Sequence, residues 1–279
     1  MPTGRAIALT ALAMLAFAGN SLLCRVALAR TGIDAASFTT VRIAAGALTL
    51  WALVRLTQGG QPVAGSWRSA LALFAYAAGF SFAYLSLTAA TGALLLFGAV
   101  QASMIGHGLW AGERPRQLAL LGMLLAFGGL IGLLLPGLSA PPLLGSLLML
   151  GAGAAWGVYS LRGRSAGDPT RATAGNFLRA VPLAAALSLV TLHRASLDPA
   201  GVASAVVSGA VASGIGYAIW YTALPALKAV QAATVQLSVP VIAALGGIAL
   251  LGEPVTLRLV WTSLAILGGI ALVIADRSR

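Results

Sequence analysis

The chain contains few charged residues and almost no side chains that bind metals through sulfur or imidazole. Of its 279 residues 8% are charged, six are Asp or Glu, two are His and one, Cys24, is Cys. A single cysteine excludes an intramolecular disulfide and a cysteine-based metal cluster. Two histidines exclude a His-rich metal site, so we predict no metal and no cofactor. Soluble domains carry about 25% charged residues, and the scarcity of charge therefore excludes a soluble protein.

Acidic residues are missing from the middle of the apolar segments. Proton- and sodium-coupled carriers usually hold a carboxylate there, because a charge inside a bilayer is costly and is kept for function. The absence favours facilitated diffusion or an unconventional coupling, and it argues against cationic substrates. The chain has no GxxxxGK[ST] phosphate loop and only one lysine, Lys228, which argues against an ATP-driven pump. Membrane enzymes usually carry a His/Asp/Glu or Ser/Lys cluster within the membrane. The sequence shows no such cluster, which argues against a membrane enzyme.

Hydrophobic residues make up 59% of the chain, and the mean hydropathy is +0.95. Apolar runs of about 20 residues, the length that spans a bilayer, predict an all-α membrane protein with ten transmembrane helices. The predicted spans are 6–29, 36–56, 67–87, 91–111, 116–136, 142–162, 172–192, 201–222, 226–250 and 255–275. The connections are short and rich in turn residues, so no loop is long enough to hold a soluble domain.

The basic residues, almost all arginine, are scattered between the apolar runs. We interpret them as topology determinants and not as a nucleic-acid surface. With the N-terminus inside, eleven of them fall on the inner face and four on the outer face, which predicts cytoplasmic N- and C-termini. In an alternative reading, Arg5, the run 7–17 and Ala16-Phe17-Ala18 imitate a cleaved signal peptide, whose removal would leave nine helices.

Charged residues and glycines recur along the chain at a nearly constant offset. The matching pairs are Arg25 with Arg162 and Arg42 with Arg179 at 137 residues, and Gly112-Glu113 with Gly252-Glu253 at 140 residues. The recurrence predicts two five-helix repeats, 1–137 and 138–279. An odd number of helices per repeat requires opposite orientations in the membrane. Two inverted repeats with the substrate between them are the usual plan of a secondary transporter.

The repeated charges suggest a gating device. Inverted symmetry brings arginines of one repeat and a glutamate of the other to each face of the membrane. We hypothesise two ionic latches that close alternately, in which Arg25 and Arg42 pair with Glu253 outside and Arg162 and Arg179 pair with Glu113 inside. Alternatively, each glutamate caps the helix that follows it, next to Pro115 or Pro254, while the arginines snorkel.

Two prolines and several glycines bear on how the helices move and pack. Pro182 and Pro240 lie in the middle of predicted helices and predict kinks at which these helices bend during transport. Gly128 and Gly132 form a GxxxG pattern, and Gly268-Gly269 repeats part of it. We expect these small faces to pack against another helix within each half or at a dimer contact. The sequence leaves open whether the protein is a monomer or a homodimer.

Aromatic and polar side chains near the middle of the predicted helices are candidates for a central cavity. Aromatic faces with a few hydrogen-bonding groups suit a small amphipathic solute. The candidate substrate-binding residues are Phe17, Asn20, Tyr76, Phe80, Tyr84, Gln101, Trp156, Tyr159, Ser213, Tyr217, Thr234 and Ser238. Such residues also join membrane helices or form interfacial belts, and this alternative stays open for each of them.

The whole chain resembles the drug/metabolite transporter superfamily in its EamA-type branch. The segments that carry the resemblance are Gly19-Asn20-Ser21, 155–162, those around Tyr84 and Tyr221, Gly112-Glu113 and Gly252-Glu253-Pro254. The resemblance implies a carrier of the bacterial inner membrane, not an enzyme. It would export amino acids or similar small metabolites by alternating access, with the bilayer and a small-molecule substrate as its partners and no nucleic acid.

Alternatives within the same fold remain. The related small multidrug exporters use a glutamate in their first helix, where this chain has Asn20, and this difference argues against proton-coupled efflux of cationic drugs. A nucleotide-sugar-type carrier would need Lys228 and Arg179 to point inward and meet phosphates. A receptor or scaffold is a further alternative, but it gives the duplicated halves no purpose.

Overall fold

A computed structural model describes residues 3–59, 61–110, 112, 117–137, 140–163, 167–227 and 235–276, and the described part is helical without strands. The long elements are α1 (Thr3–Arg30), α2 (Ala35–Thr57), α3 (Trp67–Ala83), α4 (Ala89–Trp110), α5 (Gln117–Leu134), α6 (Leu143–Gly163), α7 (Pro169–Val190), α8 (Pro199–Val207), η2 (Ser208–Ile215), α9 (Gly216–Ala223), α11 (Ser238–Leu251) and α12 (Leu257–Asp276). Two short 3-10 turns, η1 (Leu192–Arg194) and η3 (Leu224–Ala226), follow α7 and α9.

Seven helices of the described residues are long and apolar enough to cross a membrane, and two shorter apolar helices lie in α11 and α12. The prediction of an all-α membrane protein is therefore confirmed. Helix α3 is shorter than its predicted span 67–87, because the chain turns after Ala83 before α4 begins at Ala89. Ten membrane crossings and cytoplasmic termini stay predictions.

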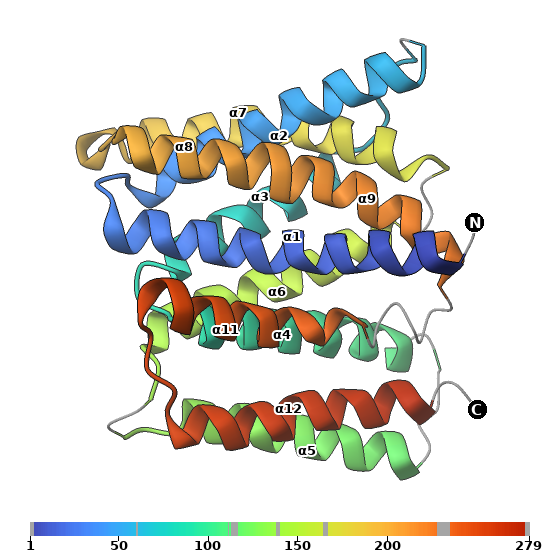
Figure 1. The fold of residues 1–279 in the computed structure, drawn as a ribbon, viewed down its shortest axis with the longest axis vertical. Coiled ribbons are helices and arrows are strands. Elements are labelled where there is room, and N and C mark those ends of the chain that lie inside the picture. Colours follow the sequence, from blue (N-terminus) through green and yellow to red (C-terminus); the bar gives the residue numbers. More distant parts are fainter. Residues whose placement is uncertain are drawn as a thin grey trace.

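The helices lie side by side, with α2 and α7 at one edge of the bundle and α5 and α12 at the other (Figure 1). Helix α2 packs on α7, α4 on α11 and α5 on α12, while α3 packs on α6 and α9 packs on α1. Each pairing joins the first half of the chain to the second. Exchanging the halves reproduces the same set of pairings, which supports the predicted two-fold relation between them.

The start of α1 and the end of α12 lie at the same end of the bundle (Figure 1). This placement agrees with an even number of crossings. Helix α1 runs from that end to the opposite one, where a short loop containing Asp34 leads into α2. We call the end with Asp34 the outer end, following the orientation that the arginines predict.

Short polar side chains begin several helices. Asp34, Asp168 and Asp198 start α2, α7 and α8 by accepting hydrogen bonds from N–H groups in the first turn, which have no partner within the helix. Ser66 and Thr256 do the same for α3 and α12. These caps help to set the residues at which the helices begin.

Asp34 also ties two outer loops together and makes the fold sensitive to pH. Burial alone would raise the pKa of Asp34, but hydrogen bonds from Ser196, Ser37 and Ala36 outweigh burial and hold it below its usual value. A lowered pKa in the folded state means that ionised Asp34 stabilises the fold above about pH 4. That contribution is lost as the pH falls through the lowered pKa.

We therefore expect the variant Asp34→Asn to lose less stability than the wild type between pH 6 and pH 3. The measurement is the thermal unfolding midpoint of the detergent-purified protein across this range. Asp198→Asn is the comparison, because Asp198 also caps a helix but accepts one backbone hydrogen bond, from Gly201 of its own helix. Equal pH profiles for the wild type and Asp34→Asn would contradict the assignment.

A π-helical segment interrupts the helix that runs from Pro199 to Ala223. In this segment, Gly209 lies directly against the carbonyl group of Arg42, where a side chain would collide with backbone. Helix α2 and η2 therefore approach closely at the level of Arg42. π-Segments inside α-helices occur frequently at functional sites.

The structure corrects the expectation for Pro240. Helix α11 begins at Ser238, so Pro240 is its third residue and not the middle of a long helix. The first-turn N–H groups of a helix have no intrahelical partner, and a proline there costs no hydrogen bond. Pro182 does lie inside α7, as predicted.

Of the expected packing glycines, Gly269 makes a close helix contact, whereas Gly128 and Gly132 do not. A side chain at Gly128 would meet nothing within 4 Å, and one at Gly132 would make only an ordinary contact with Thr262. The close contact between α5 and α12 uses Gly122 and Gly129 of α5 and Gly269 of α12, and Gly128 lies on another face of α5. A helix of 3.6 residues per turn places Gly122 and Gly129, seven residues apart, on one face.

Replacing Gly269 by leucine should strongly destabilise the protein. A side chain there would meet the carbonyl of Gly122 and lie 2.6 Å from the backbone nitrogen of Ala126, neither of which can move aside. Overpacking of this kind costs about 3 kcal/mol. Gly128→Leu is the matched control and should change stability by less than about 0.5 kcal/mol. Chemical unfolding in detergent measures both, and equal losses would contradict the assigned contact.

Candidate functional site

A small cavity with a volume of about 20 Å³ lies in the centre of the bundle between α1, α3, α4, α6 and α9. Its lining residues are Phe17, Asn20, Ser21, Tyr76, Phe80, Leu96, Phe97, Trp156 and Tyr217. Six of the twelve predicted substrate-binding residues are among them. The helical spacing on each element explains this, because Phe17, Asn20 and Ser21 share one face of α1, and Tyr76 and Phe80 share one face of α3.

Aromatic rings form most of the cavity wall, and Trp156 lies among them. The centroid of its ring is 4.8 Å from that of Tyr76, 5.1 Å from that of Tyr217 and 5.3 Å from that of Tyr159. Phe17 meets the Tyr217 ring edge-on at 5.8 Å. Because α1 and α3 belong to the first half and α6 and α9 to the second, a solute in the cavity contacts both halves.

A chain of hydrogen bonds crosses the aromatic wall. The Ser208 hydroxyl donates to Asn20 Oδ1 over 2.6 Å, and Asn20 Nδ2 donates to the Tyr76 hydroxyl over 3.2 Å. Arg42 Nη2 donates to the same hydroxyl oxygen over 3.0 Å. The four residues, which we call the polar relay, are all buried and connect η2, α1, α3 and α2. A polar relay inside an apolar bundle is typical of a functional site.

The structure places Arg42 in the centre of the protein and not beside Glu253. Its side chain is 2% exposed, and its guanidinium carbon lies 4.9 Å from the ring centroid of Phe80 and 5.3 Å from that of Tyr76. Arg42 therefore does not take part in the outer contact that the sequence predicts for it. Arg25 alone makes that contact, since α1 carries it to the outer end of the bundle.

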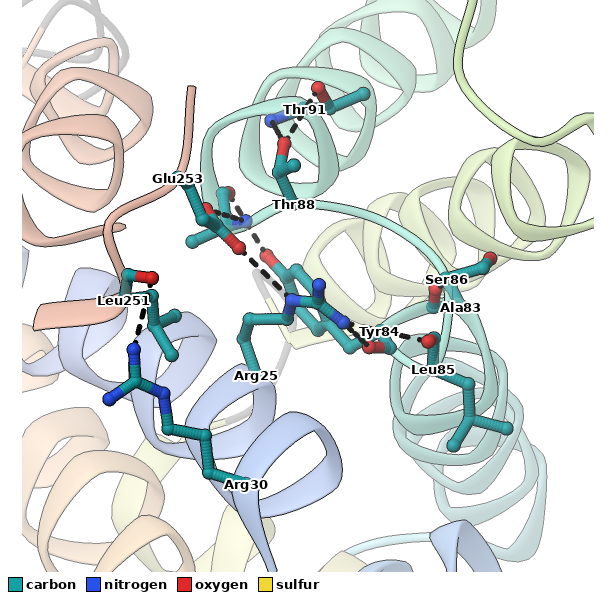
Figure 2. A network of polar contacts seen from close by, with 11 residues as sticks. Arg25, Arg30, Ala83, Tyr84, Leu85, Ser86, Thr88, Thr91, Leu251 and Glu253 are labelled. Carbon is teal, nitrogen blue, oxygen red and sulfur yellow. Dashed lines mark hydrogen bonds and ion pairs between the residues drawn. The ribbon is translucent and has the colours of Figure 1, made fainter. Parts of the chain in front are cut away.

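An ion pair joins α1 to the loop after α11 at the outer end of the bundle (Figure 2). Arg25 Nε lies 3.0 Å from Glu253 Oε1, and Arg25 Nη1 donates to the carbonyl of Tyr84 over 2.9 Å. The other carboxylate oxygen of Glu253 accepts the N–H of Ala89, the first residue of α4, over 2.8 Å. Arg30 adds a bond to the carbonyl of Leu251. These contacts join α1 and α4 to the loop after α11.

The turn at Gly252 positions Glu253. Gly252 has φ of 65°, a left-handed conformation that glycine adopts without strain, and it ends α11. The chain then reverses, and Glu253 Oε2 lies over Gly247, where an added Cβ would be only 2.6 Å away. Thr256 caps α12 in its place. The alternative in which Glu253 caps the following helix is therefore wrong, because it caps α4 of the other half.

The inner end has a different set of contacts. Arg162 Nε donates to Ser69 Oγ over 3.1 Å, so it joins α6 to α3. Arg179 Nη1 donates to the carbonyls of Ala64 and Gly175, each over 2.9 Å. Glu113, the predicted partner of both arginines, lies outside the described residues. The inner latch thus stays a prediction.

The remaining predicted cavity residues lie in other places. Tyr84 and Tyr159 pack behind Phe80 and Trp156 and are buried. Ser213 is buried in η2, and its hydroxyl has no hydrogen-bond partner among the described residues. Gln101 lines an apolar cavity between α4, α5 and α12, and Ser238 lines another between α1 and α11. Thr234 lies outside the described residues.

Residue-by-residue reasoning missed several lining groups. Ser208, which belongs to the polar relay and does not line the cavity, was also not among the candidates, and at the offset of 137 residues it matches an apolar residue, Leu71. Leu96 and Phe97 are ordinary members of an apolar helix and carry no signal in the sequence. Ser21 follows Asn20 directly and was detectable only as its neighbour on the same helix.

A multi-pass helical protein with an aromatic cavity between its halves belongs to the class of membrane transporters, and comparison with known proteins identifies the family. The model of the EamA-like transporter family matches residues 143–275. An uncharacterized protein of Pseudomonas aeruginosa is 60% identical over 278 residues, which cover 99% of this chain and 97% of that protein. The chain belongs to the EamA-like transporter family within the drug/metabolite transporter superfamily, as its motifs indicate.

More distant relatives agree with this assignment. The threonine/homoserine exporter RhtA of Salmonella typhimurium is 36% identical over 120 residues, 41% of this chain and 39% of the exporter. The exporter of the same name from Escherichia coli is 34% identical over an equal length. A crystal structure of a protein with 19% identity superposes with a TM-score of 0.67 over 95% of this chain and 98% of that one, which shows the shared fold.

Proposed function

We propose that the protein exports amino acids or similar small metabolites across the bacterial inner membrane by alternating access. The observation that carries the proposal is a central aromatic cavity that is lined by both halves. In this proposal, the Arg25–Glu253 ion pair is the contact that closes the outer end. The family assignment and the partial match to threonine/homoserine exporters support the substrate class. In this proposal, residues 1–137 and 138–279 are the two inverted repeats.

The two ends of the cavity would open in turn. In the structure, Arg25 and Glu253 hold α1 against the loop after α11 at the outer end. Separation of this pair would let the outer ends of the helices move apart. The matching inner pair, Glu113 with Arg162, would then form and close the inner end. A solute held between the aromatic rings is released outward without any covalent step.

Transport would be facilitative. None of the residues that line the central cavity carries a carboxylate. A buried carboxylate is the usual group that couples a carrier to protons or sodium ions. Export would then follow the concentration gradient of the solute, which a growing cell maintains by synthesis.

Proton-coupled export of cationic drugs is the second candidate function. Aromatic walls suit such compounds, since cations bind over aromatic faces. However, the guanidinium of Arg42 lies beside Tyr76 and Phe80 of the same wall and would repel them. The geometry therefore favours neutral, zwitterionic or anionic solutes.

Uptake of radiolabelled amino acids into proteoliposomes tests the proposal. Saturable uptake without a pH gradient is the expected result for the purified full-length protein, and empty liposomes are the control. Uptake that requires a pH gradient would contradict the facilitative mechanism. Absence of uptake for all amino acids, together with uptake of cationic dyes, would favour the drug exporter.

A further inference from the structure

Arg42 is a buried cation without a countercharge among the described residues. The guanidinium is 2% exposed, its Nη2 donates to Tyr76, and its Nη1 has no hydrogen-bond partner. The two aromatic rings beside it compensate part of the cost of burial. Burial of an unpaired charge remains unfavourable, and such residues in membrane proteins usually face a substrate or an ion.

The described carboxylates are engaged elsewhere. Asp34, Asp168 and Asp198 cap the helices α2, α7 and α8. Glu253 forms a salt bridge with Arg25. None of the four carboxylates whose side chains the structure describes is therefore left to neutralise Arg42, and Arg42 brings a positive charge to the centre of the protein.

Arg42 lies directly behind the cavity wall. Both rings that cover its guanidinium, Tyr76 and Phe80, line the cavity. The hydroxyl oxygen of Tyr76 accepts hydrogen bonds from Asn20 and from Arg42, so its own O–H proton remains available as a donor.

We infer that Arg42 and Tyr76 recognise a carboxylate, and that the transported solutes are small amphipathic monocarboxylates whose amino group is dispensable. The inference rests on the proposed function and specifies its substrate class. A carboxylate supplies the negative charge that the empty site lacks, and it accepts hydrogen bonds from a guanidinium and a hydroxyl together. Arg42 is then a binding residue and not part of the outer latch.

The amino group of an amino acid finds much weaker recognition. None of the residues lining the cavity is acidic, and the amide oxygen of Asn20 already accepts from Ser208. An ammonium group would be left to the faces of Trp156, Tyr217 and Phe17, which bind cations weakly. Removal of the amino group from a substrate should therefore cost less binding than removal of its carboxylate.

Four probes with one aromatic skeleton separate the two groups: phenylalanine, 3-phenylpropanoate, phenylalaninamide and phenethylamine. Binding to the detergent-purified wild-type protein is measured by isothermal titration calorimetry. We expect phenylalanine and 3-phenylpropanoate to bind within about 10-fold of one another, and the two probes without a carboxylate to bind at least 10-fold more weakly. Equal binding of phenylalaninamide, or no binding of the two carboxylates, would overturn the inference.

Variants of Arg42 locate the recognition. Arg42→Gln should remove the preference for carboxylates by at least 10-fold, and Arg42→Lys should keep part of it because the charge remains. Arg55→Gln is the matched control, since Arg55 lies on the same helix but is exposed and rests on Trp51. An unchanged carboxylate preference in folded Arg42→Gln would overturn the inference even if the wild type shows the expected preference.

The two proposals fail in different ways. Carboxylate-selective binding without uptake of amino acids into proteoliposomes would contradict the proposed function and leave the role of Arg42 intact. Uptake of amino acids that persists at the wild-type rate in Arg42→Gln would contradict the role of Arg42 and leave the function intact.

Discussion

Replacing Glu253 by arginine is expected to open the outer end of the carrier. The substitution removes the pair with Arg25 and places two positive charges where the structure has a 3.0 Å contact. It also removes the acceptor for the N–H of Ala89 at the start of α4. Loss of one partner of a buried pair costs about 3–5 kcal/mol. Because the two side chains are 19% and 9% exposed, we expect about 2 kcal/mol, or roughly a 30-fold shift toward the outward-open state.

The chain carries a natural reporter for this opening. Cys24 is the only cysteine of the sequence, precedes Arg25 directly and is fully buried. A membrane-impermeant maleimide applied to cells from outside should label Cys24 slowly in the wild type and at least 10-fold faster in Glu253→Arg, as the expected shift in population implies. Labelling from the inside only would contradict the predicted orientation.

Exchange of the two charges provides the decisive control. The double variant Arg25→Glu, Glu253→Arg restores opposite charges at the two positions and should slow labelling again toward the wild-type rate. Partial recovery is expected, because a glutamate at position 25 cannot donate to the carbonyl of Tyr84 as Arg25 does. Labelling of the double variant as fast as that of Glu253→Arg would show that the ion pair does not hold the outer end closed.

Replacing Asn20 by leucine is expected to reduce transport by about 10- to 100-fold. Leucine has a similar size but breaks both bonds of Asn20 in the polar relay, to Ser208 and to Tyr76. A buried polar group left without its partner costs about 1–3 kcal/mol. The Tyr76 ring then loses one of the two contacts that orient its hydroxyl toward the cavity. Initial uptake rates in proteoliposomes measure the effect.

Two serines on the same helix allow a matched comparison. Ser208→Ala removes the 2.6 Å bond to Asn20 and should reduce transport in the same direction as Asn20→Leu. Ser204→Ala, one turn earlier, removes only a bond to the carbonyl of Ala200 on its own helix and should leave transport unchanged. Equal effects of the two serine variants would show that the relay has no special role.

The sequence predicted much of the central cavity because aromatic and amide residues are uncommon in apolar helices. Phe17, Asn20, Tyr76, Phe80 and Trp156 were all chosen on that ground and all line it. Helical periodicity already placed neighbouring candidates on one face of each helix. The prediction failed for Gln101 and Ser238, which line other cavities of the bundle and not the central one.

The arginines and glutamates show what the sequence repeat could predict and what it could not. The repeat, which matches Arg25 to Arg162 and Glu113 to Glu253, suggested a pair of Arg25 with Glu253, and the structure contains this contact. The same reasoning grouped Arg42 with them, although Arg42 lies about 10 Å along α2 from its first residue, at the level of the cavity. A repeat identifies equivalent positions, but it does not say which charge is near which partner.

Composition and run length by themselves determined that this protein is an all-α membrane protein, because the bilayer admits few other solutions for such a chain. Repetition in the sequence predicts its two halves. The close contacts were decided only by the tertiary structure. The glycines that join α5 to α12, the serine that completes the relay and the unpaired guanidinium of Arg42 each depend on which helix faces which. Apolar helices look alike to one another in sequence, and van der Waals packing between particular faces selects their neighbours.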